Sequence, residues 1–147
     1  MPGDPLPALL EALRPTLISQ ISTRVHTEIP DYQNVPLEIV TERYAAIVDA
    51  LIKSLATHEP SHFTNYVERI GRTRMNQGYT INGLLTAAAI VQDVALQTIP
   101  PALAADPEAQ ASMVRRITSL LHFARLVLGR QHLDTVVHPD PSHPGRA

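Results

Sequence analysis

The stretch YVERIGRTRMNQGYTINGLLTAAAIV, residues 66–91, decides the fold, because it predicts two helices joined by a tight corner. Gly78 is expected to end the first helix, since glycine takes the left-handed C-terminal conformation at little cost. Thr80 can then cap the start of the second helix. At roughly 100° per residue, Arg74 falls in the apolar sector of the first helix. The apolar residues of that sector are Phe63, Tyr66, Val67 and Ile70.

Arg74 is the first candidate for a functional residue, because it places a charge in an apolar stripe. A guanidinium is always charged and is rarely fully buried without a partner. We therefore expect Arg74 to meet a carboxylate, a group of carbonyls or an anionic ligand. In the alternative interpretation, its methylenes cover apolar surface while its head lies in water or pairs with an acid. Arg72 falls on the opposite side of the helix.

Two motifs carry a resemblance to a known family. The first is Ile29-Pro30-x-Tyr32, and the second is Ile70-Gly71-Arg72-x-Arg74-x-x-Gln77-Gly78-Tyr79-x-Ile81, followed by Leu84-Leu85. This pattern resembles the N-terminal sensor domain of the RsbRD type, and the resemblance covers roughly residues 15 to 130 in element order. It implies a globin-like input domain without haem, as found in bacterial stress-response regulators and in front of transcription-factor and other output modules. The candidate ligand-binding or partner-binding residues are Arg74, Gly78, Tyr32, Arg72 and Gln77.

The spacing of Arg74 and Gly78 also resembles that of bacterial globins. In those proteins a proximal histidine lies four residues before a corner glycine, and an apolar Leu-Leu segment follows. Here an arginine stands at the histidine position, and arginine is not deprotonated at ordinary pH and cannot coordinate iron. The resemblance thus implies a domain that binds no haem in the usual globin way, and we expect no cofactor.

The bulk properties bound the class of protein. A chain of 147 residues fits one domain with one core. The net charge of −2 and the pI near 6.4 disfavour direct binding of nucleic acid. No uncharged apolar run is long enough for a membrane span, and no basic start followed by an apolar core indicates a secretory signal. The absence of cysteine excludes disulfides and thiolate metal sites. We expect a cytoplasmic protein.

Prolines divide residues 1–137 into about five main helices without any clear strand, which predicts an all-α domain, globin-like or a helical bundle. Pro15 fits either the first turn of a helix or a kink. The segment Ile29–Pro36 is expected to be a loop from which Tyr32 projects. Residues 138–147, HPDPSHPGRA, are expected to form a flexible Pro-rich tail or linker to a further module, and a free-standing domain is the alternative. The expected helices run from Leu9 or Thr16 to Glu28, from Leu37 to Thr57, from a Ser61 cap to Gly78, from Thr80 to Gln97, and from an Asp106 cap to about Leu133.

The helix expected at residues 80–97 is apolar around most of its circumference, so it should be central or face a second subunit. Together with the long helix after it, this favours a homodimer. Asp93 lies roughly 120° from its main apolar face. Two interpretations of Asp93 stay open: it pairs with an arginine, within the domain or across a dimer, or it is a solvent-exposed acid.

Metal and catalytic constellations are missing from the sequence. His58 and His62 are separated by Pro60, so they do not share a helical face as a zinc pair would. His26 is the one moderate candidate for an axial ligand, and a structural role is the alternative. No nucleophile motif or phosphate loop is present. We therefore expect neither a metal site nor an enzyme.

The sequence thus predicts a non-catalytic regulatory input domain. A ligand or partner near the Arg74–Gly78 corner would shift helix packing, and the last helix would pass that shift to an output domain or signalling partner. One rival is a haem- or tetrapyrrole-binding globin-type sensor, with His26 as the axial ligand. Another rival is a small helical enzyme, which would need a deep pocket that holds two groups with strongly shifted pKa values.

Overall fold

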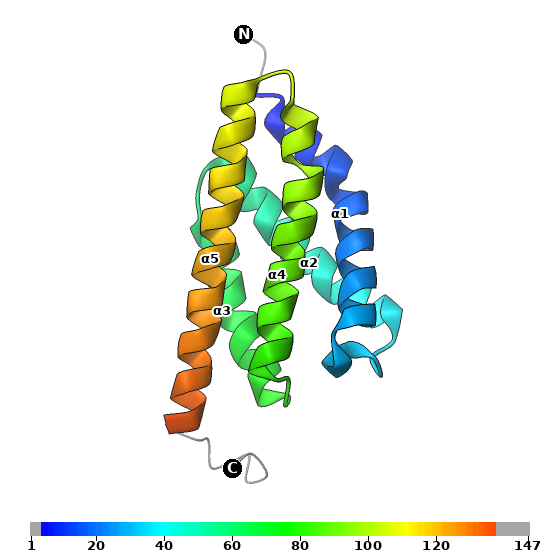
Figure 1. Ribbon diagram of the computed structural model, residues 1–147, viewed down its shortest axis with the longest axis vertical. Helices are drawn as coiled ribbons and strands as arrows, with labels where there is room; N and C mark the ends of the chain where they lie inside the picture. The colour runs from blue at the N-terminus through cyan, green and yellow to red at the C-terminus, as the bar shows by residue number, and fades with distance from the viewer. Residues whose placement is uncertain (1–3, 138–147) are drawn as a thin grey trace.

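The structure, a computed structural model, describes residues 4–137, and these residues form helices without any strand (Figure 1). The all-α prediction with five main helices is confirmed. The prediction for residues 138–147 lies outside the described residues. The elements in chain order are α1 (Leu6–Glu28), η1 (Pro30–Tyr32), α2 (Leu37–Thr57), α3 (Ser61–Asn76), α4 (Ile81–Thr98), η2 (Pro100–Leu103) and α5 (Pro107–Val137), where η marks a 3₁₀ helix.

The central helix is α4, which packs against α1 on one side and α5 on the other (Figure 1). Helix α1 also packs on α2, and α3 packs on both α2 and α5. The segment Ile81–Leu103 is long and apolar enough to cross a membrane, but 56% of its apolar 18-residue window is buried inside the bundle. Its apolarity is therefore that of a core helix, and the prediction of a central fourth helix is confirmed.

Helix α1 begins earlier than predicted and does not break at Pro15. It runs from Leu6 to Glu28, so the expected start at Leu9 or Thr16 is wrong. The side chain of Pro15 is exposed, whereas Leu10 and Leu17 on either side of it are fully buried. Burial of these two leucines holds the chain in helical register and offsets the backbone hydrogen bond that a proline removes.

The start of α3 depends on a side chain from another helix. Ser61 is the first helical residue, so the prediction that it caps α3 is wrong. Instead, the Ser54 hydroxyl of α2 accepts the N–H of Phe63 at 2.8 Å and donates to the carbonyl of Pro60 at 3.3 Å. Ser54 is buried, and its hydroxyl thus satisfies a backbone N–H of the first turn of α3 that Ser61 leaves unpaired.

The corner between α3 and α4 has the predicted form. Gly78 has a φ of +93°, and the N–H of Tyr79 donates to the carbonyl of Arg74 at 3.0 Å. This is the hydrogen bond that closes a helix at a left-handed glycine. The Thr80 hydroxyl accepts the N–H of Gly83 at 3.0 Å, so its predicted role as cap is confirmed. The corner fixes where the side chain of Arg74 leaves α3.

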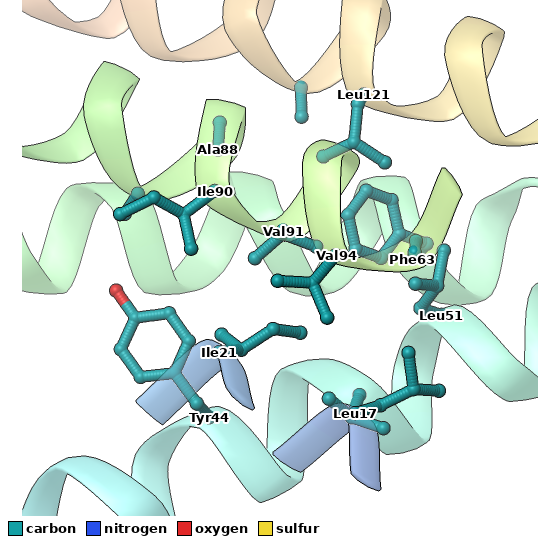
Figure 2. Packing of buried hydrophobic residues seen from close by; sticks show 14 of the residues in the cluster. Leu17, Ile21, Tyr44, Leu51, Phe63, Ala88, Ile90, Val91, Val94 and Leu121 are labelled. Carbon is teal, nitrogen blue, oxygen red and sulfur yellow. The ribbon is translucent and has the colours of Figure 1, made fainter. Parts of the chain in front are cut away.

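The core is aliphatic, with Tyr32, Tyr44 and Phe63 as its aromatic members. Figure 2 shows Tyr44 and Phe63 among the aliphatic side chains. Helix α5 begins as predicted, because the Asp106 carboxylate accepts the N–H of Ala109 at 3.1 Å. It continues to Val137, beyond the expected end near Leu133. The inward face of α5 consists of Met113, Ile117, Leu120, Leu121, Ala124, Leu128 and Gln131.

Candidate functional site

A cavity of about 60 Å³ lies between α2, α3, α4 and α5, and Tyr32 of η1 closes one part of its wall. We call it the Arg74 cavity. Its interior is almost entirely apolar, because the buried walls come from aliphatic and aromatic side chains. These include Phe63 and Val67 of α3, Ala88 of α4, and Leu121, Ala124 and Leu128 of α5.

The mouth of the Arg74 cavity lies between α2 and α3. Among the residues that line the cavity, four are partly exposed and the others are buried. The four are Arg43 and Ile47 of α2 and Ile70 and Arg74 of α3. Two arginines therefore stand where an apolar cavity meets solvent.

Arg74 lines the cavity with a guanidinium that no acid neutralises. Its Nη1 donates to Oε1 of Gln77 at 2.9 Å. Within residues 4–137, no carboxylate lies within 4 Å of the Arg74 guanidinium. Its partly exposed position agrees with the alternative interpretation, in which the methylenes cover apolar surface and the guanidinium reaches the solvent. Among the described residues, the guanidinium does not pair with an acid. The charge remains available to an anion.

Two tyrosines of the cavity wall, Tyr32 and Tyr44, form a cluster with Tyr79 of the corner between α3 and α4. The Tyr44 hydroxyl donates to the Tyr32 hydroxyl at 3.1 Å, and the ring centroids of Tyr32 and Tyr79 are 4.9 Å apart. Arg43 Nη1 donates to the Tyr79 hydroxyl at 2.7 Å. The expectation that Tyr32 projects from a loop is wrong, because it belongs to η1 and its side chain is only 1% exposed. An apolar ring packs better in the core than in solvent.

Asp31 ties this wall to the start of α4. Its carboxylate accepts the N–H of Thr80 at 2.7 Å and faces the Thr80 hydroxyl at 3.1 Å. A Cβ built on Gly83 would lie 3.0 Å from the Asp31 carboxylate, so the glycine leaves room for it. An acid at the positive end of a helix is favourable. The position of Tyr32 is thereby fixed through its neighbour in the chain.

Burial changes the acidity of the tyrosine pair. Burial raises the pKa of Tyr32, which the hydrogen bond from Tyr44 partly offsets. It raises the pKa of Tyr44 well above the ordinary value of 10.0, and the neighbouring Tyr32 raises it further. Both hydroxyls therefore stay protonated at neutral pH, where they serve as hydrogen-bond donors and acceptors.

We expect the folded chain to resist ionisation of Tyr32 and Tyr44 above pH 10. Because their pKa values are higher in the folded state than in the unfolded state, the folded state keeps protons that the unfolded state loses. The contribution of these two tyrosines to stability should thus be constant below pH 10 and fall as the pH rises beyond it. Tyrosinate absorbance, recorded with far-UV circular dichroism, measures both. Complete ionisation of all four tyrosines near pH 10 in a folded chain would contradict this expectation.

The other predicted site residues lie around the corner but do not line the cavity. Arg72 has a side chain that is 67% exposed, and its Nη2 lies 3.5 Å from Glu68. Gln77 and Gly78 are exposed, and Gln77 reaches the site through Arg74. The structure thus brings Arg74, Gln77 and Tyr32 to one place and leaves Arg72 on the outer side of α3.

Three polar residues of the site were not predicted. They are Arg43, Tyr44 and Asp31, and each joins the site through a contact that is distant in sequence. The nearest signal is the Pro-Asp-Tyr segment that precedes the buried ring of Tyr32. Nothing in helical spacing connects Asp31 with Thr80, or Arg43 with Tyr79.

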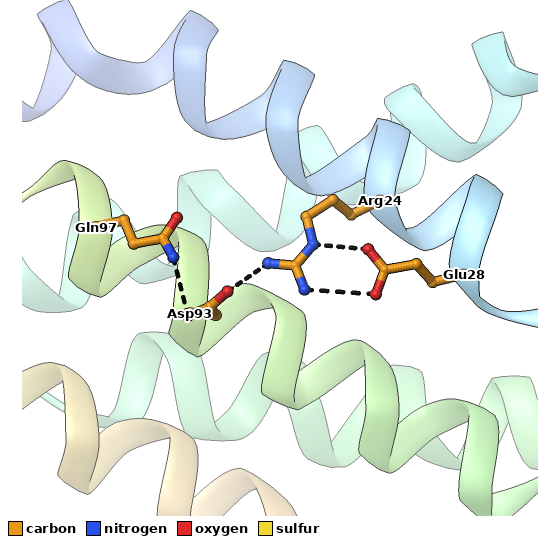
Figure 3. A network of polar contacts seen from close by, with 4 residues as sticks. All are labelled: Arg24, Glu28, Asp93 and Gln97. Carbon is orange, nitrogen blue, oxygen red and sulfur yellow. Dashed lines mark hydrogen bonds and ion pairs between the residues drawn. The ribbon is translucent and has the colours of Figure 1, made fainter.

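Asp93 belongs to a separate network that joins α1 to α4 (Figure 3). Arg24 Nη1 lies 2.5 Å from Asp93 Oδ2, and Arg24 Nε lies 2.7 Å from Glu28 Oε2. Gln97 Nε2 donates to Asp93 at 3.2 Å. Hydrogen bonds from the Arg24 guanidinium hold the pKa of Glu28 below its usual value. Of the interpretations of Asp93, the pairing with an arginine of the same domain is the one observed.

Histidines take no part in the Arg74 cavity. His26 is half-buried on α1, and no residue of α1 lines the cavity. In the part of the chain that the structure describes, no three His, Asp or Glu side chains cluster as metal ligands would. The donors at the cavity are two guanidiniums and the tyrosine hydroxyls, which can bind an anion but provide no ligand that soft metals prefer.

The match to a known family covers this whole site. The sequence model described as the RsbT co-antagonist protein rsbRD N-terminal domain matches residues 15–135. That range runs from the first half of α1 nearly to the end of α5 and includes every residue of the cavity. No curated protein and no solved structure matches the chain.

Proposed function

The chain belongs to the family of RsbT co-antagonist protein RsbRD N-terminal domains, and from this premise we propose that it is a non-catalytic regulatory input domain of a bacterial signalling protein. One observation supports the choice of site. The Arg74 cavity has a charged mouth on α2 and α3, while its far wall is the inward face of α5. A ligand or partner group that enters through the mouth and reaches the far wall would contact the last helix.

The proposed mechanism is a shift in the packing of α5. An occupant of the cavity would press on Leu121, Ala124 and Leu128 of α5. Because a close-packed interior is not freely compressible, the contact favours a second arrangement of the helix over the first. The occupant shifts the population only by its difference in affinity for the two arrangements. The end of α5 then presents this change to an output domain or a signalling partner.

The proposed domain works without haem or another tetrapyrrole. Arg74 replaces the histidine of the globin pattern, and His26 is not in the cavity wall. The volume of about 60 Å³ is also far below the roughly 300 to 1,000 Å³ of ordinary ligand pockets. Titration with haem, followed in the Soret region, should give no tight 1:1 complex. A complex that is lost on His26→Ala would support the globin-type rival.

The absence of catalysis is proposed on the residues that line the cavity. Arginine and tyrosine are the only lining residues with polar side chains, and no histidine or carboxylate stands beside them as a base. The net charge of −2 disfavours direct binding of nucleic acid. The apolar helix α4 is used in the core rather than in a membrane. We also propose that the domain is cytoplasmic.

We also propose that the domain forms a homodimer through the outer side of α5. Exposed apolar side chains at heptad-like spacing mark that side. They are Phe123, Leu126, Leu133 and Val137. Sedimentation should give about twice 16.1 kDa for the chain. Leu126→Glu should produce a folded monomer, whereas Val114→Glu, outside this stripe, should not; a wild-type monomer would contradict the dimer.

Arg74→Ala should change the hydrogen-exchange protection of α5 and leave the helical content of the chain nearly intact. The substitution removes the charge at the mouth and the contact with Gln77, so the amides of α5 at residues 121–137 should change their hydrogen-exchange protection. Mass spectrometry of exchange measures this segment by segment. Arg72→Ala is the matched control, since it removes the same side chain from the outer side of the same helix.

The control should leave the protection of α5 unchanged. If Arg74→Ala lowers protection evenly over the whole chain, its arginine is a structural residue and the proposed site is wrong. Equal changes in both variants would lead to the same conclusion.

A further inference from the structure

We propose that the Arg74 cavity binds a short monocarboxylate of about three to five carbons, whose carboxylate meets Arg43 and Arg74 and whose alkyl end enters the apolar interior. The chain length of the ligand follows from the volume of the cavity. About 60 Å³ is the space that roughly two water molecules occupy in the liquid, and a short alkyl end can fill it. This inference rests on the proposed function, because it names the ligand class of the same site.

The charge of the ligand follows from the two arginines. The ion pairs among residues 4–137 involve Arg14, Arg24 and Arg72, whereas neither arginine of the mouth faces an acid. Arg43 and Arg74 have only neutral partners, the Tyr79 hydroxyl and the Gln77 amide oxygen. A guanidinium has five N–H donors, so most donors of both remain open to a carboxylate, which it binds with two parallel hydrogen bonds.

The tyrosines of the cavity wall add a neutral hydrogen-bond donor for the carboxylate and bring no negative charge that would repel it. Since Tyr44 donates to the Tyr32 hydroxyl, the proton of Tyr32 is itself free to be donated. Both tyrosines line the cavity. No Asp, Glu or His side chain lines it, so an amine or a metal cation would meet only like charges and hydroxyls. The site therefore selects an anion over a cation.

The apolar interior decides between kinds of anion. Phosphate or sulfate would be held by the arginines alone and would leave the interior unfilled. An alkyl end fills the interior, because burial of each methylene should tighten binding by about fourfold. Ala87, Ala88 and Ala124 leave the room that larger side chains would fill. A long fatty acid would need a deeper cavity than this one.

The test is a calorimetric or NMR titration of the whole chain with butyrate. Butyramide, butylamine, octanoate and inorganic phosphate are the comparison ligands. Butyrate should bind saturably and more tightly than each of them. Arg74→Gln should weaken butyrate roughly 10- to 100-fold, which corresponds to a hydrogen bond to a charged group. Arg72→Gln, the control on the outer side of α3, should not change its affinity.

A second variant separates binding from folding. Ala88→Leu fills the cavity and should raise the melting temperature while it abolishes butyrate binding. The proposal is overturned if butyrate gives no saturable signal, if butyramide binds equally well, or if Ala88→Leu binds butyrate unchanged. If butyrate fails while Arg74→Ala still alters exchange in α5, the ligand class alone is refuted. If both fail, the proposed function is refuted as well.

Discussion

Replacement of Phe63 by alanine should lower the free energy of unfolding by about 3 to 5 kcal/mol. Phe63 is 1% exposed and lies in the core (Figure 2). It also lines the Arg74 cavity. Removal of the ring would enlarge a cavity that already exists, and the surrounding helices cannot collapse into it fully. Because domains are typically stable by about 5 to 15 kcal/mol, this loss would leave the chain marginally folded.

Phe123→Ala is the matched control for Phe63→Ala, since these are the two phenylalanines of the chain. Phe123 is 48% exposed on α5, so its loss should cost less than about 1 kcal/mol. Urea unfolding followed by far-UV circular dichroism measures both variants. It should be repeated at a lower protein concentration, because Phe123 lies in the proposed dimer face. Equal losses in the two variants would show that the packing at Phe63 is looser than described.

Replacement of Gly78 by alanine should lower the free energy of unfolding by about 1 to 2 kcal/mol. The φ of +93° at Gly78 strains any residue with a Cβ, while no heavy atom lies within 4 Å of the added carbon. The cost is therefore one of backbone conformation and not of contact. Because the side chain of Arg74 extends from α3 next to this corner, the substitution should also lower the affinity for any ligand that Arg74 binds.

Gly129→Ala isolates the conformational effect. A Cβ at Gly129 also meets nothing within 4 Å, but this glycine lies inside α5 with helical backbone. Alanine there should raise the free energy of unfolding by up to about 1 kcal/mol, since glycine is the poorer helix former. Thermal and urea unfolding of the two variants should thus move in opposite directions. A shift of Gly78→Ala in the stabilising direction would contradict the left-handed corner.

Local chemistry made much of the fold predictable. Gly78, Thr80 and Asp106 act within a few residues of their own position, so the corner and the two helix starts could be read from the sequence. The stripe that contains Arg74 depends only on helical spacing. That spacing placed Arg74 beside the cavity, although it could not show that the residue has no acid partner.

Contacts between distant segments were not predictable in the same way. Ser54 caps α3 only because α2 packs beside it, and Asp31 reaches Thr80 across 49 residues. The continuity of α1 through Pro15 also depends on tertiary burial, which outweighs the local preference of proline. Arg43 was missed for this reason. Its proposed role rests on its position at the cavity mouth, opposite α3, which the pattern of residues along α2 does not indicate.

The proposed displacement of α5 by an occupied cavity is most directly tested by a distance between spin labels. The chain has no cysteine, so labels can be placed at Gln20→Cys on α1 and Val136→Cys on α5, both exposed. Labelled chains diluted with unlabelled chains report distances within one subunit. With Ala88→Leu as the filled state, the distance should shift by about 1 to 2 Å, as for helix shifts in other switches. Identical distance distributions with and without Ala88→Leu would contradict the proposed transmission through α5.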